Sequence, residues 1–109
     1  MRIDFPALFK ELKDGVLEIA RSTVKDYAAA AVKDGMNILN NLKTELKIWV
    51  KDVADGKMSA DDFEYNLKSY AALISMVTLK QEGLALVSAD RFRNDVINLI
   101  IDTVTGKIK

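Results

Sequence analysis

The residues that most resemble a chemical site lie between Lys51 and Asp62, where an acidic loop separates two helical patterns. Gly56 and Asp62 fall at the sixth and twelfth positions of a calcium-binding loop, as that motif requires. The first and third positions hold Lys51 and Val53, whose side chains offer no oxygen ligand. We therefore reject a calcium site and interpret Asp55 and Gly56 as the end of a helix.

The chain contains no histidine and no cysteine, two residue types that commonly serve in catalysis and in metal binding. The usual general base at neutral pH, the thiolate nucleophile and the nitrogen and sulfur metal ligands are therefore missing. Di-metal carboxylate bundles need inward Glu-x-x-His pairs, which this chain cannot form. We predict no catalytic residue, no metal site and no cofactor, and hence a protein that is not an enzyme.

Lysines recur every four residues at Lys43, Lys47 and Lys51, which places them on one face of a helix. A phosphate group or a protein partner would suit such a stripe. The whole chain, however, has 16 basic and 16 acidic residues and a formal net charge of zero. We therefore interpret the stripe as a solvated face near a helix C-terminus, and we expect no nucleic-acid partner.

Large apolar residues recur every eleven positions in the first half of the chain. Eleven residues make three turns of a nearly straight helix, so each row stays on one face. The unbroken phase predicts one helix over residues 5–54, with Asp4 as its N-cap and Pro6 in its first turn. The two rows are Phe5, Val16, Tyr27, Ile38 and Trp49, and Phe9, Ala20, Ala31, Leu42 and Val53.

A second helical pattern runs over residues 59–105, after a turn at residues 55–58. Ser59 to Asp62 has the spacing of a capping box, which marks the start of a helix. We predict a single all-α domain over residues 1–109, more than three-quarters helical. Its expected form is a long antiparallel hairpin with coiled-coil-like packing and arms of about 70 Å.

Such a hairpin cannot surround its own core, so its broad apolar faces need a partner. Folding the chain at Gly56 brings two stretches of small apolar residues together in the middle of the hairpin. We predict that a second copy packs there, which gives a homodimeric four-helix bundle. The self-association residues are Ala28, Ala30, Ala31, Val32, Gly83, Leu84, Ala85 and Val87.

The chain also permits a compact monomeric up-down four-helix bundle. The residues from Ser59 to Phe63 read Ser-Ala-Asp-Asp-Phe, and those from Ser88 to Phe92 read Ser-Ala-Asp-Arg-Phe. Ser88 is therefore a candidate start of a further helix, and a matching break near Gly35 would complete four helices. The apolar phase continues across Gly35, which favours the hairpin.

These features favour a non-enzymatic helical interaction or assembly module that acts through self-association and partner-helix packing. The alternative is an amphipathic protein that binds a lipid surface or an apolar ligand, because eleven-residue repeats suit helices lying on an interface. The apolar run at residues 71–79 is about half of the ~20 residues that span a bilayer. The N-terminus lacks a signal-peptide pattern. We expect no transmembrane segment and a cytoplasmic protein.

Overall fold

The structure, a computed structural model, describes residues 3–74 and 76–108. The protein is 85% helical, and no strand occurs in the described part of the chain, which confirms the all-α prediction. The single domain expected over residues 1–109 includes residues 1, 2, 75 and 109, which lie outside the described residues. The elements are α1 (Phe5–Thr23), the 3-10 turn η1 (Lys25–Tyr27), α2 (Ala28–Ala54), α3 (Ala60–Ala71), α4 (Val77–Gln81) and α5 (Leu86–Ile108).

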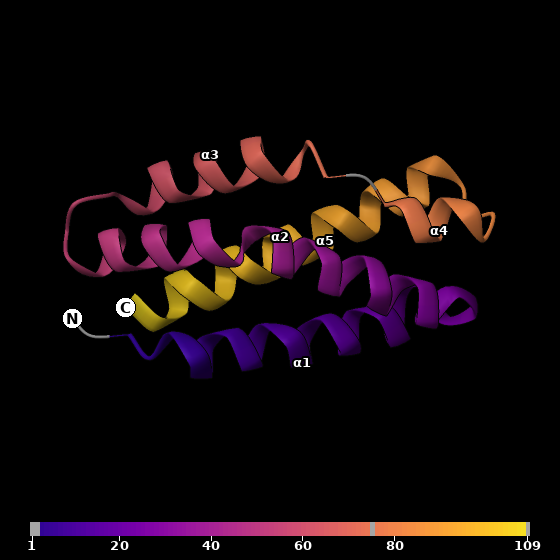
Figure 1. Ribbon diagram of the computed structural model, residues 1–109, viewed down its shortest axis with the longest axis horizontal. Coiled ribbons are helices and arrows are strands. Elements are labelled where there is room, and N and C mark those ends of the chain that lie inside the picture. Colours follow the sequence, from indigo (N-terminus) through magenta and orange to yellow (C-terminus); the bar gives the residue numbers. More distant parts are fainter. Residues whose placement is uncertain (1–2, 75, 109) are drawn as a thin grey trace.

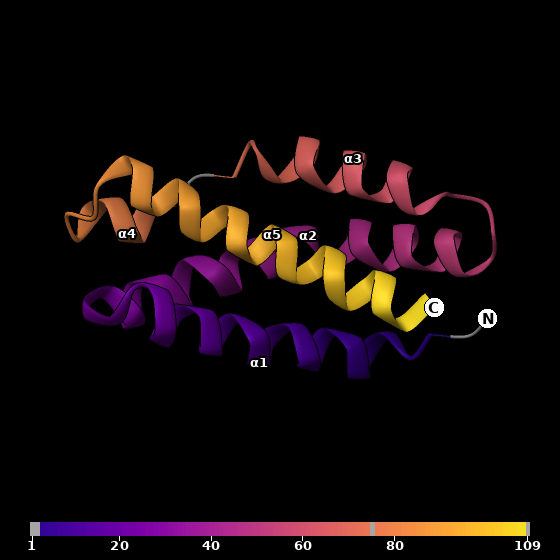
Figure 2. The same cartoon turned by 180° about the vertical axis from the view of Figure 1, so that it is seen from behind.

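The four longer helices run alternately in opposite directions along the long axis of the molecule (Figure 1). α1 packs on α2 and α5, and α3 also packs on α2 and α5, so that the four helices enclose one core. The short helix α4 lies at the end where α1 turns into α2, as both views show (Figure 2). The dimensions are 43 × 23 × 20 Å, which correct the expected hairpin with arms of about 70 Å.

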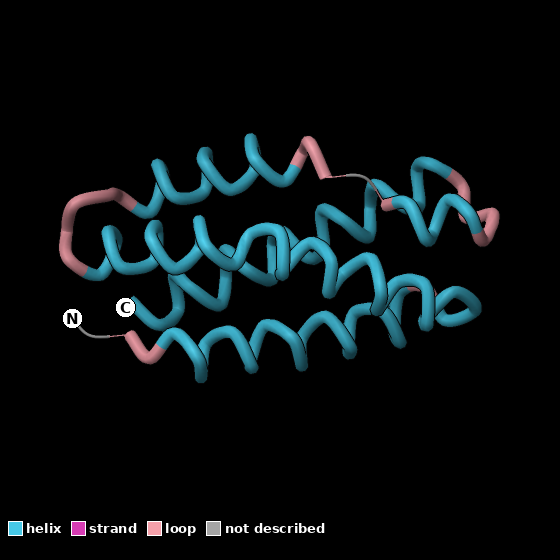
Figure 3. The backbone as a smooth tube through the Cα atoms, viewed as in Figure 1, coloured by secondary structure: helices cyan, strands magenta, loops and turns pink. Residues whose placement is uncertain are grey.

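The core lies between the four helices. Most loops lie at the two ends of the bundle, whereas the loop that follows α3 lies partway along it (Figure 3). The side chains of the core come from positions spaced three or four residues apart, as expected for helices with one apolar face. One chain therefore buries much of the apolar surface for which the sequence predicted a second copy. Fully buried members include Leu12, Val16, Ile38, Leu42, Leu46, Phe63, Leu67, Phe92, Val96 and Ile100.

The predicted helix over residues 5–54 is broken between Thr23 and Ala28. The hydroxyl groups of Ser22 and Thr23 both donate hydrogen bonds to the backbone oxygen of Ile19, at 3.3 and 2.7 Å. Such bonds compete with the helix ladder for its carbonyl groups, and β-branched residues also favour the helix less. The chain turns at this point, and α2 returns along α1.

The eleven-residue phase survives this break because the interruption is about one turn long. Residues 24–27 separate the two helices, and one α-helical turn takes 3.6 residues. The apolar rows therefore resume on the correct face when α2 begins at Ala28. The rows identified the buried faces correctly, since Val16, Ala31 and Ile38 are all fully buried. They gave no information on whether one helix or two carried them.

Gly35 lies inside α2 and does not break it, contrary to the alternative prediction. It is buried where α2 meets α1 and α5. A Cβ atom at this position would clash with Val16 and lie 3.4 Å from the ring of Phe92. This glycine therefore serves the close approach of three helices rather than a turn.

The second predicted helix, over residues 59–105, does not run as one helix: α3 ends at Ala71, α4 covers Val77–Gln81 and α5 begins at Leu86. Gly83 has a φ of 95°, in the left-handed region that favours glycine. The N–H groups of Gly83 and Leu84 donate to the oxygens of Lys80 and Leu79, both at 3.1 Å. This is the glycine-dependent ending of a helix, which the continuous arm of the predicted hairpin lacks and which the four-helix alternative placed near Ser88. The break expected near Ser88 therefore lies a few residues earlier, and Ser88 is the third residue of α5.

The local predictions around the first turn and the two helix starts are confirmed. Gly56 has a φ of 77° and ends α2 in the same way as Gly83 ends α4. The Asp4 side chain caps α1 by accepting a 3.2 Å hydrogen bond from the N–H of Ala7. Ser59 caps α3 through a 3.0 Å hydrogen bond from the N–H of Asp62 to its Oγ atom.

Candidate functional site

Four large apolar side chains are exposed on and beside the short helix α4. Leu73 follows α3 and is 86% exposed, and Val77 is the first residue of α4 and is 50% exposed. Leu86 and Val87 form the first turn of α5 and are 59% and 71% exposed. We call these four residues the apolar end surface.

This exposure follows from the short segments that carry the four residues. α4 has only five residues, so it inserts Leu79 into the core and leaves Val77 on the outer side. α5 buries Ala89 and Phe92, and its first turn precedes them. The fold thus leaves the side chains at the α4 end of the bundle only partly covered.

The sequence around the apolar end surface is depleted in charge. Residues 70–79 and residues 83–89 contain no charged side chain, and only Lys80 and Glu82 are charged between them. Depletion of charge around exposed apolar residues is typical of the core of a protein interface. Exposed apolar patches on folded proteins are also frequent interaction sites.

The structure separates the predicted self-association residues into three groups. Two are buried inside the bundle: Ala30 and Ala31. Three are partly buried: Ala28, Val32 and Leu84. Three are exposed: Gly83, Ala85 and Val87.

The two segments of that predicted set lie at the same end of the bundle, whereas the sequence placed them together in the middle of a hairpin. Ala30 lines a cavity together with Thr78 and Glu82 of the α4 region. Leu84 and Ser88 line another cavity with residues 22–27. These contacts join parts of one chain, whereas the sequence analysis placed a second copy there. Of the predicted set, the exposed residues all lie in the segment at residues 83–87.

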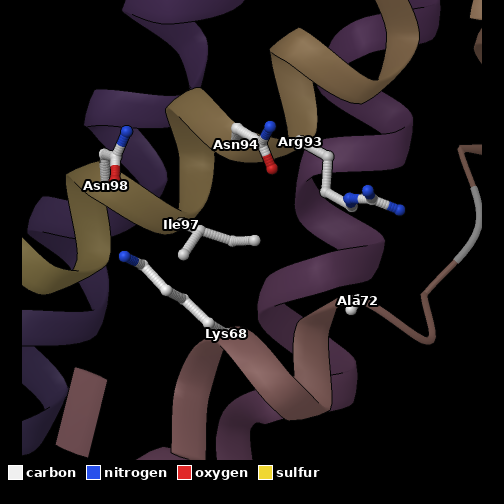
Figure 4. Close-up of a pocket in the computed structure, with 6 residues that line it drawn as sticks. All are labelled: Lys68, Ala72, Arg93, Asn94, Ile97 and Asn98. Carbon is white, nitrogen blue, oxygen red and sulfur yellow. The ribbon is translucent and has the colours of Figure 1, made fainter. Parts of the chain in front are cut away.

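A polar groove of about 360 Å³ lies between α3 and α5 (Figure 4). Lys68 and Ala72 line it from α3, and Asn94 and Asn98 line it from α5. The Lys68 ammonium group pairs with Glu64 at 2.7 Å, so its charge is already partly compensated. The groove contains no acidic lining residue. It can donate and accept hydrogen bonds, but its lining provides no pair for acid–base catalysis.

Arg93 forms one end of this groove, and its guanidinium group points away from Lys68 (Figure 4). Its Nε atom is buried and has no hydrogen-bond partner among the described residues. The closest acidic oxygen is Oδ1 of Asp90, 3.8 Å from Nη2 of Arg93, which is too long for a strong hydrogen bond. The unpaired nitrogen of Arg93 depends on packing that a sequence pattern does not show.

The one buried acidic residue that the structure describes is Asp34, on α2. Its two carboxylate oxygens accept hydrogen bonds from the backbone N–H groups of Thr78 and Leu79 at the start of α4. The sequence carries a signal for this burial, because Asp34 lies three or four residues from Ala30, Ala31 and Ile38 on the apolar face. The bonds make Asp34 a cap for another helix, which is a structural role.

Comparison of the chain with family models, with curated proteins and with solved structures finds no match. The function must therefore be argued from the residues themselves. Within the described residues, no three acidic side chains gather closely enough to hold a metal ion. None of the described helices combines the length and apolar character needed to cross a membrane.

Proposed function

We propose that this protein is a non-enzymatic helical interaction module that associates with a second copy of itself through the apolar end surface. The observation that carries the proposal is the exposure of Leu73, Val77, Leu86 and Val87 within charge-depleted segments. The lack of histidine and cysteine supports a role that requires no catalysis.

A second copy suits this surface for two physical reasons. The formal net charge of zero means that two identical chains do not repel each other strongly. An apolar surface is also complementary to itself, as a two-fold symmetric contact requires. The contact proposed here differs from the one inferred from the sequence, because Ala30 and Ala31 are now taken as parts of the core.

The expected affinity follows from the size of the surface. Full burial of a leucine or valine side chain contributes about 1.5–3 kcal/mol, and each copy supplies four such residues. Association itself costs roughly 4–15 kcal/mol in lost translational and rotational freedom. We therefore expect dimerisation in the micromolar range, where the dimer exchanges with the monomer.

Sedimentation velocity at protein concentrations from about one to several hundred micromolar tests the proposal. We expect the sedimentation coefficient of the unmodified chain to rise with concentration, from the value for 12.1 kDa to that of the dimer. The double variant Leu86→Gln/Val87→Gln should remain monomeric over the same range. Both side chains are exposed, so this variant should retain the helical content and unfolding midpoint of the parent.

Ile48→Gln is the matched control, because Ile48 is 55% exposed on α2 and lies outside the apolar end surface. This variant should dimerise like the parent. A parent chain that stays monomeric at several hundred micromolar would contradict the proposal. Equal loss of association in Ile48→Gln and in the double variant would assign the contact to a different face.

A further inference from the structure

A second site lies where the start of α1 passes beside the last turns of α2. Phe5 and Phe9 are one helical turn apart on α1, and their ring centroids are 5.8 Å apart. Four lysines surround the two rings, two from each helix. They line a cavity of about 440 Å³ whose residues are Phe5, Pro6, Phe9, Lys10, Lys13, Lys43 and Lys47. We call this cavity the lysine–phenylalanine pocket.

One lysine ammonium group from each of the two helices lies over the ring of Phe9. Nζ of Lys13 lies 5.0 Å from the ring centroid, and Nζ of Lys43 lies 5.1 Å from it. Both distances fall within the range of cation–π attraction. The antiparallel packing of α1 on α2 thus brings together cations that are thirty residues apart in the sequence.

The lysines of this pocket are not paired with acidic side chains in the described residues. No acidic residue lines the pocket, and none of its four lysines forms an ion pair within the described part of the chain. Four ammonium groups around one cavity repel one another, and an anion that binds between them relieves this repulsion. Lys43 and Lys47, interpreted from the sequence as part of a solvated face, therefore form half of a cationic cluster on a chain with zero net charge.

The walls of the pocket specify a second property of the ligand. Phe5 and Pro6 provide apolar surface beside the lysines, and Phe9 forms a buried base. A cavity of about 440 Å³ lies in the size range of small-molecule sites. Lysine ammonium groups bind phosphate well as point charges with three donors each. A ligand that uses both features has a compact anionic head and an apolar body.

We propose that the lysine–phenylalanine pocket binds a phosphate monoester that carries an apolar or aromatic body. The phosphate lies among the ammonium groups of Lys10, Lys13, Lys43 and Lys47, and the body packs on Phe5 and Pro6. This binding function is separate from self-association, because the pocket is lined from the start of α1 and the last turns of α2, whereas α4 and the start of α5 lie at the other end of the bundle (Figure 1).

The test is a chemical-shift titration of the ¹⁵N-labelled chain at constant ionic strength with three probes: phenyl phosphate, inorganic phosphate and phenol. We expect phenyl phosphate to shift the amide signals of residues 5–13 and 43–47. Inorganic phosphate lacks the apolar body and phenol lacks the charge, so each should bind at least roughly tenfold more weakly. Equal binding of phenyl phosphate and inorganic phosphate would overturn the proposal, as would the absence of any saturable shift.

Two double variants locate the site. Lys13→Gln/Lys43→Gln removes the two ammonium groups held over Phe9 and should weaken the binding of phenyl phosphate by roughly tenfold or more. Lys25→Gln/Lys33→Gln removes the same net charge from exposed positions at the opposite end of the bundle, and should bind like the parent. All four side chains are exposed, so neither variant should disturb the fold. Equal weakening by both variants would show that only net charge matters and would overturn the assigned site.

A vesicle arm distinguishes a lipid head group from a free phosphate ester. Sedimentation with phosphatidylcholine vesicles that contain or lack phosphatidic acid presents the same phosphate monoester on a membrane. Binding only to phosphatidic acid vesicles, lost in Lys13→Gln/Lys43→Gln, would assign the site to a lipid head group. Binding of phenyl phosphate without vesicle binding would assign it to a soluble ester. Both results presuppose the saturable shift with phenyl phosphate, and its absence overturns the proposal whatever the vesicles show.

Discussion

The buried carboxylate of Asp34 accepts a 2.7 Å hydrogen bond from the backbone N–H of Leu79, 45 residues further along the chain. Its other oxygen accepts a 3.0 Å bond from the N–H of Thr78. α4 has only five residues, and its own N-cap residue, Met76, provides no side-chain hydrogen bond. Asp34 therefore supplies from α2 the cap that α4 lacks, and its negative charge suits the positive end of the helix.

We predict that Asp34→Ala lowers the free energy of unfolding by roughly 2–3 kcal/mol, because two buried N–H groups lose a charged acceptor. The loss of stability should be largest in α4. Hydrogen exchange should therefore accelerate more at the amides of Thr78 and Leu79 than at the amides of α1. Asp14→Ala is the control, because Asp14 is exposed and forms no bond with the described residues. A uniform acceleration over the whole bundle would mean that α4 does not depend on Asp34 in particular.

Gly35 gives a second prediction. Gly35 and Gly106 both lie in helices, but Gly35 is buried between packed helices and Gly106 is exposed. Gly35→Ala should destabilise the bundle by about 1–3 kcal/mol, since the added Cβ atom clashes with Val16 between packed helices. Gly106→Ala meets no atom within 4 Å and should be neutral or stabilising by up to ~1 kcal/mol, as expected from helix propensity. Chemical denaturation of both variants and the parent measures the sign of the change in the free energy of unfolding for each substitution. A stabilising Gly35→Ala would mean that α1 and α2 can separate at low cost.

Ser59 gives a third prediction, because its Oγ atom caps α3. Ser59→Ala should lower the free energy of unfolding by about 1 kcal/mol, the usual cost of removing a hydroxyl N-cap. Ser69→Ala is the matched control, since Ser69 is exposed inside the same helix and alanine favours helix there. Thermal unfolding followed by circular dichroism measures both. An unchanged midpoint for Ser59→Ala would show that the cap contributes little in solution.

Local signals predicted the parts of this fold that depend on neighbouring residues. The caps at Asp4 and Ser59 and the turn at Gly56 follow from residue types within four positions. The break after Thr23 has no glycine or proline to mark it, and its length of about one turn preserves the apolar phase. The break at Gly83 agrees with the four-helix alternative, whereas the apolar residues around it favoured the continuous helix of the hairpin. Periodicity therefore identified the buried faces without fixing the number of helices.

The candidate sites depend on distant pairings, which explains why sequence reasoning found so little of them. Lys43 and Lys47 form an ordinary surface stripe until α1 brings Lys10 and Lys13 beside them. The acidic character of Asp34 on an apolar face was visible, but its partners lie more than forty residues away. Val87 was named from the sequence, whereas Leu73 was not, because its exposure results from the end of α3 two residues before it.

Arg93 gives the last prediction, because it carries a buried nitrogen that the fold does not satisfy. Its Nε atom has no hydrogen-bond partner among the described residues, and its 3.8 Å contact with Asp90 is weak. The methylene stem of an arginine packs like an apolar side chain, and methionine has a similar stem without the nitrogen atoms.

Arg93→Met should therefore leave the free energy of unfolding unchanged or raise it by up to about 1 kcal/mol, since an unpaired buried donor disappears. Arg91→Met on the exposed side of the same helix provides the control, and its effect should stay within about 0.5 kcal/mol. Urea denaturation of the two variants and the parent, measured at equal protein concentration, makes the comparison. A loss of more than 1 kcal/mol in Arg93→Met alone would mean that the guanidinium group is satisfied in solution, by water or by a bound anion in the groove between α3 and α5.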